Sequence, residues 1–119
     1  MATSETSNSA WLVTEGRVLA SAEVAADRNS RRRGLLGRSH VEGAFVLGPC
    51  RWVHTIGMRF PIDVAYLDAD GVVVKAVQMH RHRIGAPVPR ARTVVEASRG
   101  SFARWGVRVG DRLEIRAGS

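Results

Sequence analysis

The sequence predicts a mainly β fold (α+β is the alternative), a single-domain sandwich or squashed barrel of about seven short strands with two short helices. Three observations lead to this prediction. Apolar and polar residues alternate in several short segments, Gly-containing turns separate these segments, and only two windows have helical spacing. A length of 119 residues suits one domain, which we place at 10–117 after a disordered tail at 1–9.

The N-terminal half begins with a predicted hairpin, in which residues 11–14 and 17–25 flank the turn Glu15-Gly16. Asp27 is a predicted helix N-cap, because its carboxylate can accept the unpaired amides of a first turn. The helix is expected over 28–36 and ends at Gly37, with Leu35 and Leu36 as its core contacts and Gly34 weakening it.

The central strands are expected at 44–47, 62–67 and 72–79. Gly48-Pro49 ends the first of them. The second is predicted to be half-buried, because Ile62, Val64 and Tyr66 alternate with Asp63 and Ala65. The turn residues at 68–71 join it to the third strand in a hairpin.

After a loop at 80–92, the sequence predicts a strand at 93–97 and one or two helical turns at 100–106. Ser101 is the predicted cap of these turns, and Phe102 and Trp105 point inward at i, i+3 spacing. A turn at 109–112 leads into the last strand at 112–116, where Leu113 alternates with charged residues.

The chain carries a formal charge of +7, with a single lysine, Lys75, among its 18 basic residues. This balance suggests an anionic partner or, alternatively, a solvated surface in a protein encoded by an Arg-rich genome. Aromatic content of 6% favours the second interpretation, because nucleic-acid surfaces usually interleave aromatic and basic residues. No secretory signal or membrane-length apolar run is visible, and the one cysteine cannot form an intrachain disulfide, so we expect a soluble, cytoplasmic protein.

The polar candidates form two groups, one with Cys50, His54, Thr55 and Asp63, the other with His80 and His82. A hairpin of 62–67 with 72–79 would bring the two groups together. The candidate ligand-binding surface therefore consists of six residues: His54, Thr55, Met58, Asp63, His80 and His82. The three histidines are weak candidates for metal ligands, since no CxxC or HExxH spacing is present. We expect no catalytic residue, metal or cofactor.

Two single residues have alternative interpretations. Cys50 next to Arg51 and near His54 has the composition of an activated thiol, but a buried, inert cysteine is the preferred interpretation. Asp63 lies between core residues on a strand, which favours a structural carboxylate paired with an arginine or with backbone amides. Three arginines in a row at 31–33 suit either a docked anion or a solvated surface, and we prefer the solvated surface.

Four motifs resemble those of one known family. They are Gly34-Leu35-Leu36-Gly37-Arg38, the segment from His54 to Asp68, Val94-Val95-Glu96-Ala97 with Gly100, and Trp105-Gly106-Val107 followed by Val109-Gly110-Asp111. In this order they are similar to the domain of unknown function 192, or uncharacterised protein family 0127, over about 18–115. The resemblance implies a mainly β bacterial or archaeal protein without an agreed activity, and an accessory role beside pilus or secretion genes. We assign structural roles to its matching positions and to the predicted cap: Asp27, Gly34, Arg38, Pro61, Asp63, Gly71, Glu96, Gly110 and Asp111.

Three functions follow from these observations. The leading hypothesis is a non-catalytic ligand-binding or accessory module with a protein partner, because no catalytic constellation is complete. The second is a small-molecule or metal-dependent enzyme that uses the His54, Asp63, His80 and His82 region. The third is an anion or nucleic-acid binder that uses the arginines of 28–38 and 81–92, which the scarcity of aromatics does not favour.

Overall fold

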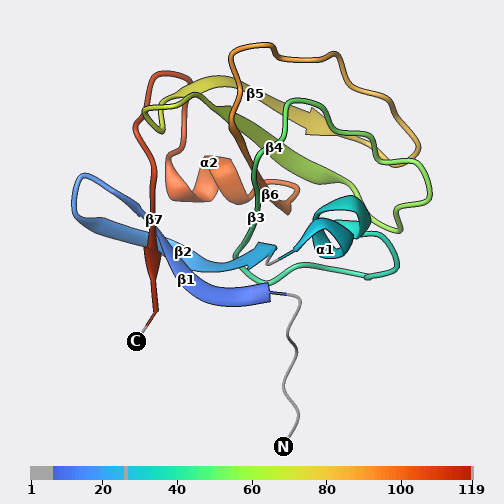
Figure 1. The fold of residues 1–119 in the computed structure, drawn as a ribbon, viewed down its shortest axis with the longest axis horizontal. Helices are drawn as coiled ribbons and strands as arrows, with labels where there is room; N and C mark the ends of the chain where they lie inside the picture. Colours follow the sequence, from blue (N-terminus) through green and yellow to red (C-terminus); the bar gives the residue numbers. More distant parts are fainter. Residues whose placement is uncertain (1–6, 26, 119) are drawn as a thin grey trace, which may run out of the picture.

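Seven strands of the chain form one mixed sheet with two short helices beside it, which confirms the predicted fold class (Figure 1). The computed structural model describes residues 7–25 and 27–118. The sheet order is β5-β4-β6-β3-β2-β1-β7. Its elements are β1 (Ser7–Thr14), β2 (Arg17–Ala25), α1 (Arg28–Arg33), β3 (Ala44–Leu47), β4 (Ile62–Leu67), β5 (Val73–Met79), β6 (Thr93–Ser98), α2 (Ser101–Trp105) and β7 (Glu114–Ala117).

The sheet curls until its two ends meet. Every neighbouring pair of strands is antiparallel except β2 and β3, which are parallel. A β-bridge between Val72 and Arg112 joins the segments that precede β5 and β7, the two outermost strands. Backbone hydrogen bonds from Gly110 N to Val73 O and from Leu113 N to Gly71 O, both 2.8 Å long, extend this contact. Of the two predicted architectures, a sandwich and a squashed barrel, the structure is therefore the squashed barrel.

Alternation along the strands sends side chains into two separate cores. In β4, Ala65 and Leu67 pack with Phe102 of α2 in the first core, which the curled sheet encloses. Ile62 and Tyr66 face the other side and pack in the second core, which α1 and the loops at 48–61 and 80–92 cover. The period of two is the ordinary consequence of the β pleat.

The prediction that β4 is half-buried was wrong, since all six of its residues are buried. The alternation in the sequence is real, but both faces of this strand are covered. Loops 48–61 and 80–92 form a layer over the face that a two-layer fold would leave in water. Loop burial of this kind leaves no periodic signal, so the sequence pattern did not show it.

Helix α1 is shorter than predicted. Asp27 caps it as expected, with Asp27 Oδ1 accepting from Ser30 N at 2.8 Å and Ser30 Oγ accepting from Asp27 N at 3.1 Å. The helix ends at Arg33 because Gly34 adopts a positive φ of 54°, which other residues rarely adopt. The chain then turns, so that Leu35 is buried while Leu36, predicted as a core contact, is 42% exposed.

Helix α2 is capped by a distant side chain. Ser101, the predicted cap, lies inside the helix, and the N-cap is Gly100, which has no side chain to offer. Asp63 Oδ2 on β4 accepts from Gly100 N at 3.1 Å and from Phe102 N at 3.0 Å. The predicted inward orientation of Phe102 and Trp105 is confirmed, since both pack against the first core.

The remaining differences concern the ends of the chain. The first strand begins at Ser7 rather than at residue 11, so part of the predicted tail at 1–9 pairs with β2; residues 1–6 lie outside the described residues. The last strand is Glu114–Ala117 rather than 112–116. Within 7–25 and 27–118, no helix is long and apolar enough to cross a membrane.

Candidate functional site

Thr55 joins the two long loops, 48–61 and 80–92, that cover the second core. Its side chain is fully buried, and its Oγ1 donates to His80 O at 2.6 Å while accepting from Arg83 N at 2.8 Å. Its backbone N also donates to Arg83 O at 2.8 Å, and its backbone O accepts from His82 N at 2.9 Å. The structure therefore places Thr55, a candidate ligand contact, in the interior, where its hydrogen-bonding capacity is used by the protein.

Two candidate histidines hold the turn that follows Thr55. His54 Nδ1 accepts from Ile56 N at 3.2 Å, and His82 Nδ1 accepts from Gly57 N at 3.1 Å. These bonds leave Nε2 as the protonated nitrogen of each neutral ring. The histidines thus contribute to the shape of the loops.

The six candidate residues do not form one site. His54 and Met58 line one cleft, whereas His80 and His82 line another with Pro61. Asp63 lies on the opposite face of β4, under α2. Within the described part of the chain, no three His, Cys, Asp or Glu side chains are grouped closely enough to hold a metal ion. His54 therefore lies in a different cleft from His80 and His82.

The first cleft has a carboxyl group on its floor. Glu96 is the fourth residue of β6 and shares the face of Val94, so the strand directs it into the second core. Its cross-strand neighbours are Phe45 of β3 and Val64 of β4, both apolar. The side chain is only 6% exposed, and no described residue donates a hydrogen bond to it. Burial accordingly raises the pKa of Glu96 from 4.5 to about 7.

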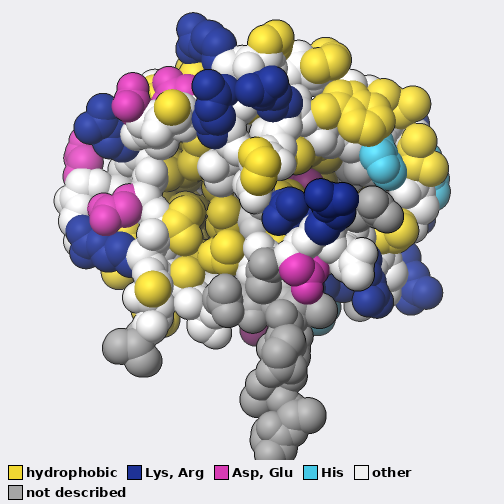
Figure 2. All heavy atoms as spheres, viewed as in Figure 1, with side chains coloured by type: hydrophobic (Ala, Val, Ile, Leu, Met, Phe, Trp, Pro, Cys, Tyr) yellow, Lys and Arg dark blue, Asp and Glu magenta, His cyan; other side chains and the backbone are white. Residues whose placement is uncertain are grey.

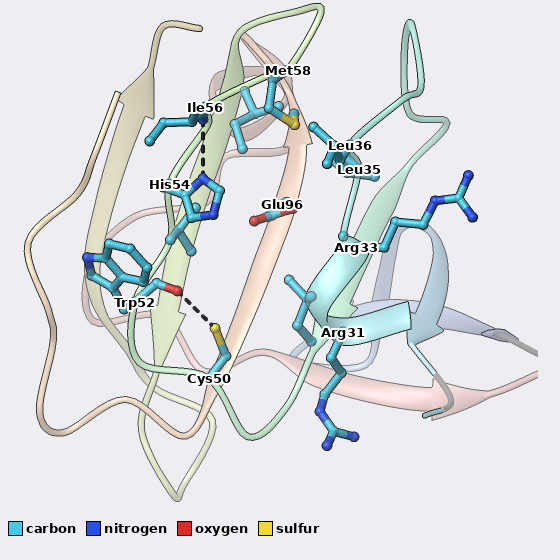
Figure 3. Close-up of a pocket in the computed structure, with 14 residues that line it drawn as sticks. Arg31, Arg33, Leu35, Leu36, Cys50, Trp52, His54, Ile56, Met58 and Glu96 are labelled. Carbon is cyan, nitrogen blue, oxygen red and sulfur yellow. Dashed lines mark hydrogen bonds between the residues drawn. The ribbon is translucent and has the colours of Figure 1, made fainter. Parts of the chain in front are cut away.

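The walls of the Glu96 cleft are mostly apolar. Figure 3 shows the carboxyl between His54 on one side and the segment of Leu35 and Arg33 on the other. The stems of Arg31 and Arg33 line the cleft, while their guanidinium groups point away from Glu96. The cavity has a volume of about 100 Å³, which suits a group of a few heavy atoms rather than a whole cofactor.

Exposed apolar side chains surround the mouth of this cleft. Trp52 is 45% exposed, Ile56 49% and Leu36 42%. The Trp52 indole is held in place, since its Nε1 donates to Gly85 O at 2.7 Å and its ring lies 5.4 Å from that of His54. Large apolar side chains left in water around a cavity are a feature of binding surfaces.

Cys50 lines the same cleft but is not an activated nucleophile in this arrangement. Its thiol donates to Trp52 O at 3.3 Å rather than to a base. Burial raises the pKa of Cys50, which lowers the fraction of reactive thiolate. If His54 Nδ1 were the base, it would have to take the thiol proton. This nitrogen already accepts a hydrogen bond from a backbone amide.

The residues assigned structural roles have varied surroundings. Arg38 forms a two-pronged ion pair with Glu23, with N–O distances of 2.8 and 2.7 Å. Asp111 Oδ2 accepts from Arg108 N at 2.8 Å in the turn before β7. Gly71 has a φ of 82°, and a Cβ there would lie 2.6 Å from Leu113 O. Gly110, with a φ of 98°, occupies the same turn as Asp111. Pro61 directly precedes β4.

The sequence prediction gives Glu96 a structural role and does not place it at a cleft. In the structure its carboxyl makes no hydrogen bond within the described chain and opens onto a cleft. The available signal was an acid at an i+2 position from Val94 in an otherwise apolar strand. Trp52 and Leu36 were also missed, because nothing in their spacing indicates that they surround a common opening.

Known relatives extend the comparison beyond this chain. The chain is similar to a Pyrococcus furiosus protein named UPF0127 protein PF1050. The two are 39% identical over 62 residues, which are 52% of this chain and 53% of that protein. The alignment thus spans about half the length of this curated relative.

Two crystal structures share the fold, each with a TM-score of 0.74. One is a Novosphingobium aromaticivorans protein of unknown function, 18% identical over 91% of this chain and 84% of its own. The other is a Sinorhizobium meliloti protein whose description suggests a transcription regulator, 22% identical over 97% of this chain and 98% of its own. At these identities the likeness concerns the fold alone.

The family comparison covers most of the described structure. The family model DUF192, described as an uncharacterised ACR, matches residues 11–115. This range includes every strand and both helices except the beginning of β1 and the end of β7, and it includes the Glu96 cleft. The chain therefore belongs to the DUF192 family of uncharacterised proteins.

Proposed function

We propose that this chain is a non-catalytic binding module, and that its Glu96 cleft accepts a small polar group carried on an apolar body. The observation that carries the proposal is a carboxyl that is 6% exposed, has no hydrogen-bond donor among the described residues, and faces an open cavity. An unpaired buried acid destabilises a fold. A ligand that donates a hydrogen bond to this carboxyl would remove the penalty, and the gain would contribute to the free energy of binding.

The surroundings of the cleft support binding rather than catalysis. Polar side chains that chemistry would need serve the fold, as His54 Nδ1 holds a turn, Thr55 joins two loops and Asp63 Oδ2 caps α2. The apolar rim at Trp52 and Ile56 provides area for the rest of a ligand, whether it is a small molecule or a segment of a partner protein.

The alternatives have less support. Basic side chains lie in several separate groups on the face drawn in Figure 2, rather than in the continuous stripe typical of nucleic-acid binding. The helices α1 and α2 have six and five residues, which is short for a helix that reads a DNA groove, so we do not extend the description of the Sinorhizobium protein to this chain. The free thiol of Cys50 suits a reducing compartment, and we propose a cytoplasmic location.

Amide-resolved NMR with short-chain alcohols, amides and amines tests this proposal. We expect chemical-shift changes at the amides of 35–36, 50–58 and 95–97. Ile56→Ala should weaken binding about fivefold, because it removes apolar area from the rim. The matched control is Val109→Ala, another exposed apolar side chain that lies outside the cleft, which should leave affinity unchanged. Shift changes confined to other surfaces, or a turnover that disappears in His54→Ala, would contradict a binding module.

A further inference from the structure

We infer that the group which the Glu96 cleft holds is a primary ammonium at the end of an unbranched apolar chain; this inference rests on the proposed function of the cleft. It begins from the donors that surround the carboxyl. The Cys50 thiol donates to a backbone carbonyl, the Trp52 indole donates to Gly85 O, and the Arg31 and Arg33 guanidinium groups point away. His54, whose Nε2 carries the ring proton, lines the same cleft, but no hydrogen bond joins it to Glu96. In the structure the Glu96 carboxyl therefore accepts no hydrogen bond from a described residue.

An ammonium meets this need better than other small groups. It carries three N–H donors and a full positive charge, so it satisfies both oxygens and neutralises the buried carboxylate together. A carboxylate or phosphate would meet a like charge on the floor of the cleft. A hydroxyl offers only one donor and leaves the charge unpaired.

The shape and the walls of the cleft point to the same ligand. A volume of about 100 Å³ admits an ammonium with a few methylene groups, and the apolar side chains of Leu35, Val53 and Met58 suit such a chain. The Trp52 ring also lines the cleft, and aromatic rings of this kind attract organic cations. Larger planar cations would need more room beside Glu96.

Binding of an ammonium to Glu96 should depend on pH, because it requires the ionised carboxylate. With a pKa of about 7, roughly a tenth of Glu96 is ionised at pH 6 and roughly nine tenths at pH 8. The expected affinity therefore rises about tenfold between these values. The other titratable or charged groups that face the cleft or interact with Glu96 are Arg31 and Arg33 from α1, Cys50 and His54 from the covering loop, and Tyr66 from β4.

The test uses n-butylammonium, 1-butanol and butyrate, titrated separately into the full chain at pH 6 and pH 8 and followed by amide-resolved NMR. Alkyl ammonium groups stay protonated over this range, with a pKa of roughly 10. We expect n-butylammonium to bind at least tenfold more tightly than 1-butanol at pH 8, to lose about tenfold at pH 6, and butyrate not to bind in the cleft. Glu96→Gln should remove the preference for the amine and its pH dependence, while 1-butanol still binds.

The outcomes separate this inference from the proposed function. Equal binding of the amine and the alcohol, or an amine affinity that is independent of pH in the unmodified chain, would overturn the ammonium and leave the binding cleft in place. An absence of shift changes at 50–58 and 95–97 with all three probes would overturn both. The pH dependence of the unmodified chain is measured even if Glu96→Gln does not fold.

An ammonium can come from a free amine or from a lysine of a partner protein, and a fourth probe distinguishes them. Nα-acetyl-lysine N-methylamide presents the same ammonium and chain on a peptide backbone. Tighter binding than that of n-butylammonium assigns the cleft to a lysine side chain, with the backbone against the exposed Trp52 and Ile56. Weaker binding assigns it to a free amine.

Discussion

Replacing Glu96 with glutamine should stabilise the protein at neutral and alkaline pH. Glutamine keeps the size of the side chain and removes the charge. In the folded state Glu96 has a pKa of about 7, whereas in the unfolded chain it has the ordinary value of 4.5. The difference corresponds to about 3 kcal/mol of unfolding free energy, since one pKa unit is about 1.4 kcal/mol.

The sign of the stability change and its pH range follow from whether Glu96 holds its proton in the folded and unfolded states. Between pH 4.5 and 7 the unfolded chain has released this proton and the folded chain still holds it, so raising the pH favours unfolding. The native protein should therefore lose stability across this range and lose nothing further from Glu96 above about pH 7. Below pH 4.5 the acid is neutral in both states, and the variant should match the native chain closely.

Urea denaturation at half-unit steps from pH 4.5 to 8.5 measures this difference. We expect Glu96→Gln to be about 3 kcal/mol more stable than the native chain at pH 8 and nearly equal to it at pH 4.5. Glu42→Gln makes the same chemical change on an exposed side chain and should follow the native profile. A Glu96→Gln profile parallel to the native one, or a less stable variant at pH 8, would show that the carboxylate is stabilised within the fold and would refute the reasoning.

Three further changes test the parts of the structure that surround the cleft. Asp63→Ala should cost about 3 kcal/mol in urea denaturation, because two amides at the start of α2 lose a charged acceptor, and a loss below about 1 kcal/mol would contradict this cap. Thr55→Val should cost about 2 kcal/mol and speed hydrogen exchange at the Arg83 amide, and unchanged exchange there would argue against the link between the loops. Arg38→Ala should cost about 1 kcal/mol or less at low salt and less still in 1 M salt, since its pair with Glu23 is about one third exposed, and a salt-independent loss would assign the effect to packing.

Much of the fold was predictable because its signals are local. The period of two in residues 62–67, the turn at 68–71 and the cap at Asp27 depend on neighbouring residues only, and the structure confirms each of them. Element boundaries were less accurate. The prediction placed the end of α1 at Gly37 although Gly34 already has the positive φ that ends a helix.

The candidate site was not predictable in the same way. His54, His80 and His82 looked like one cluster because the β4–β5 hairpin brings their loops together, which the structure bears out. The loops then use Nδ1 of His54 and of His82 in backbone hydrogen bonds and direct the histidines into two different clefts. Such bonds depend on the exact path of an irregular loop, which has no periodic signal.

A small, basic, mainly β fold with these turns and caps can be predicted from the sequence, because local backbone preferences and alternation act between near neighbours. Which polar groups find hydrogen-bond partners depends on tertiary contacts. Asp63 and Glu96 are both acids in apolar strands, but Asp63 Oδ2 accepts from two amides of α2 while Glu96 faces an open cleft. The second oxygen of Asp63, Oδ1, is buried without a partner among the described residues. The physical reason is that a hydrogen bond requires a partner within about 3 Å, and that partner comes from segments far away in the chain.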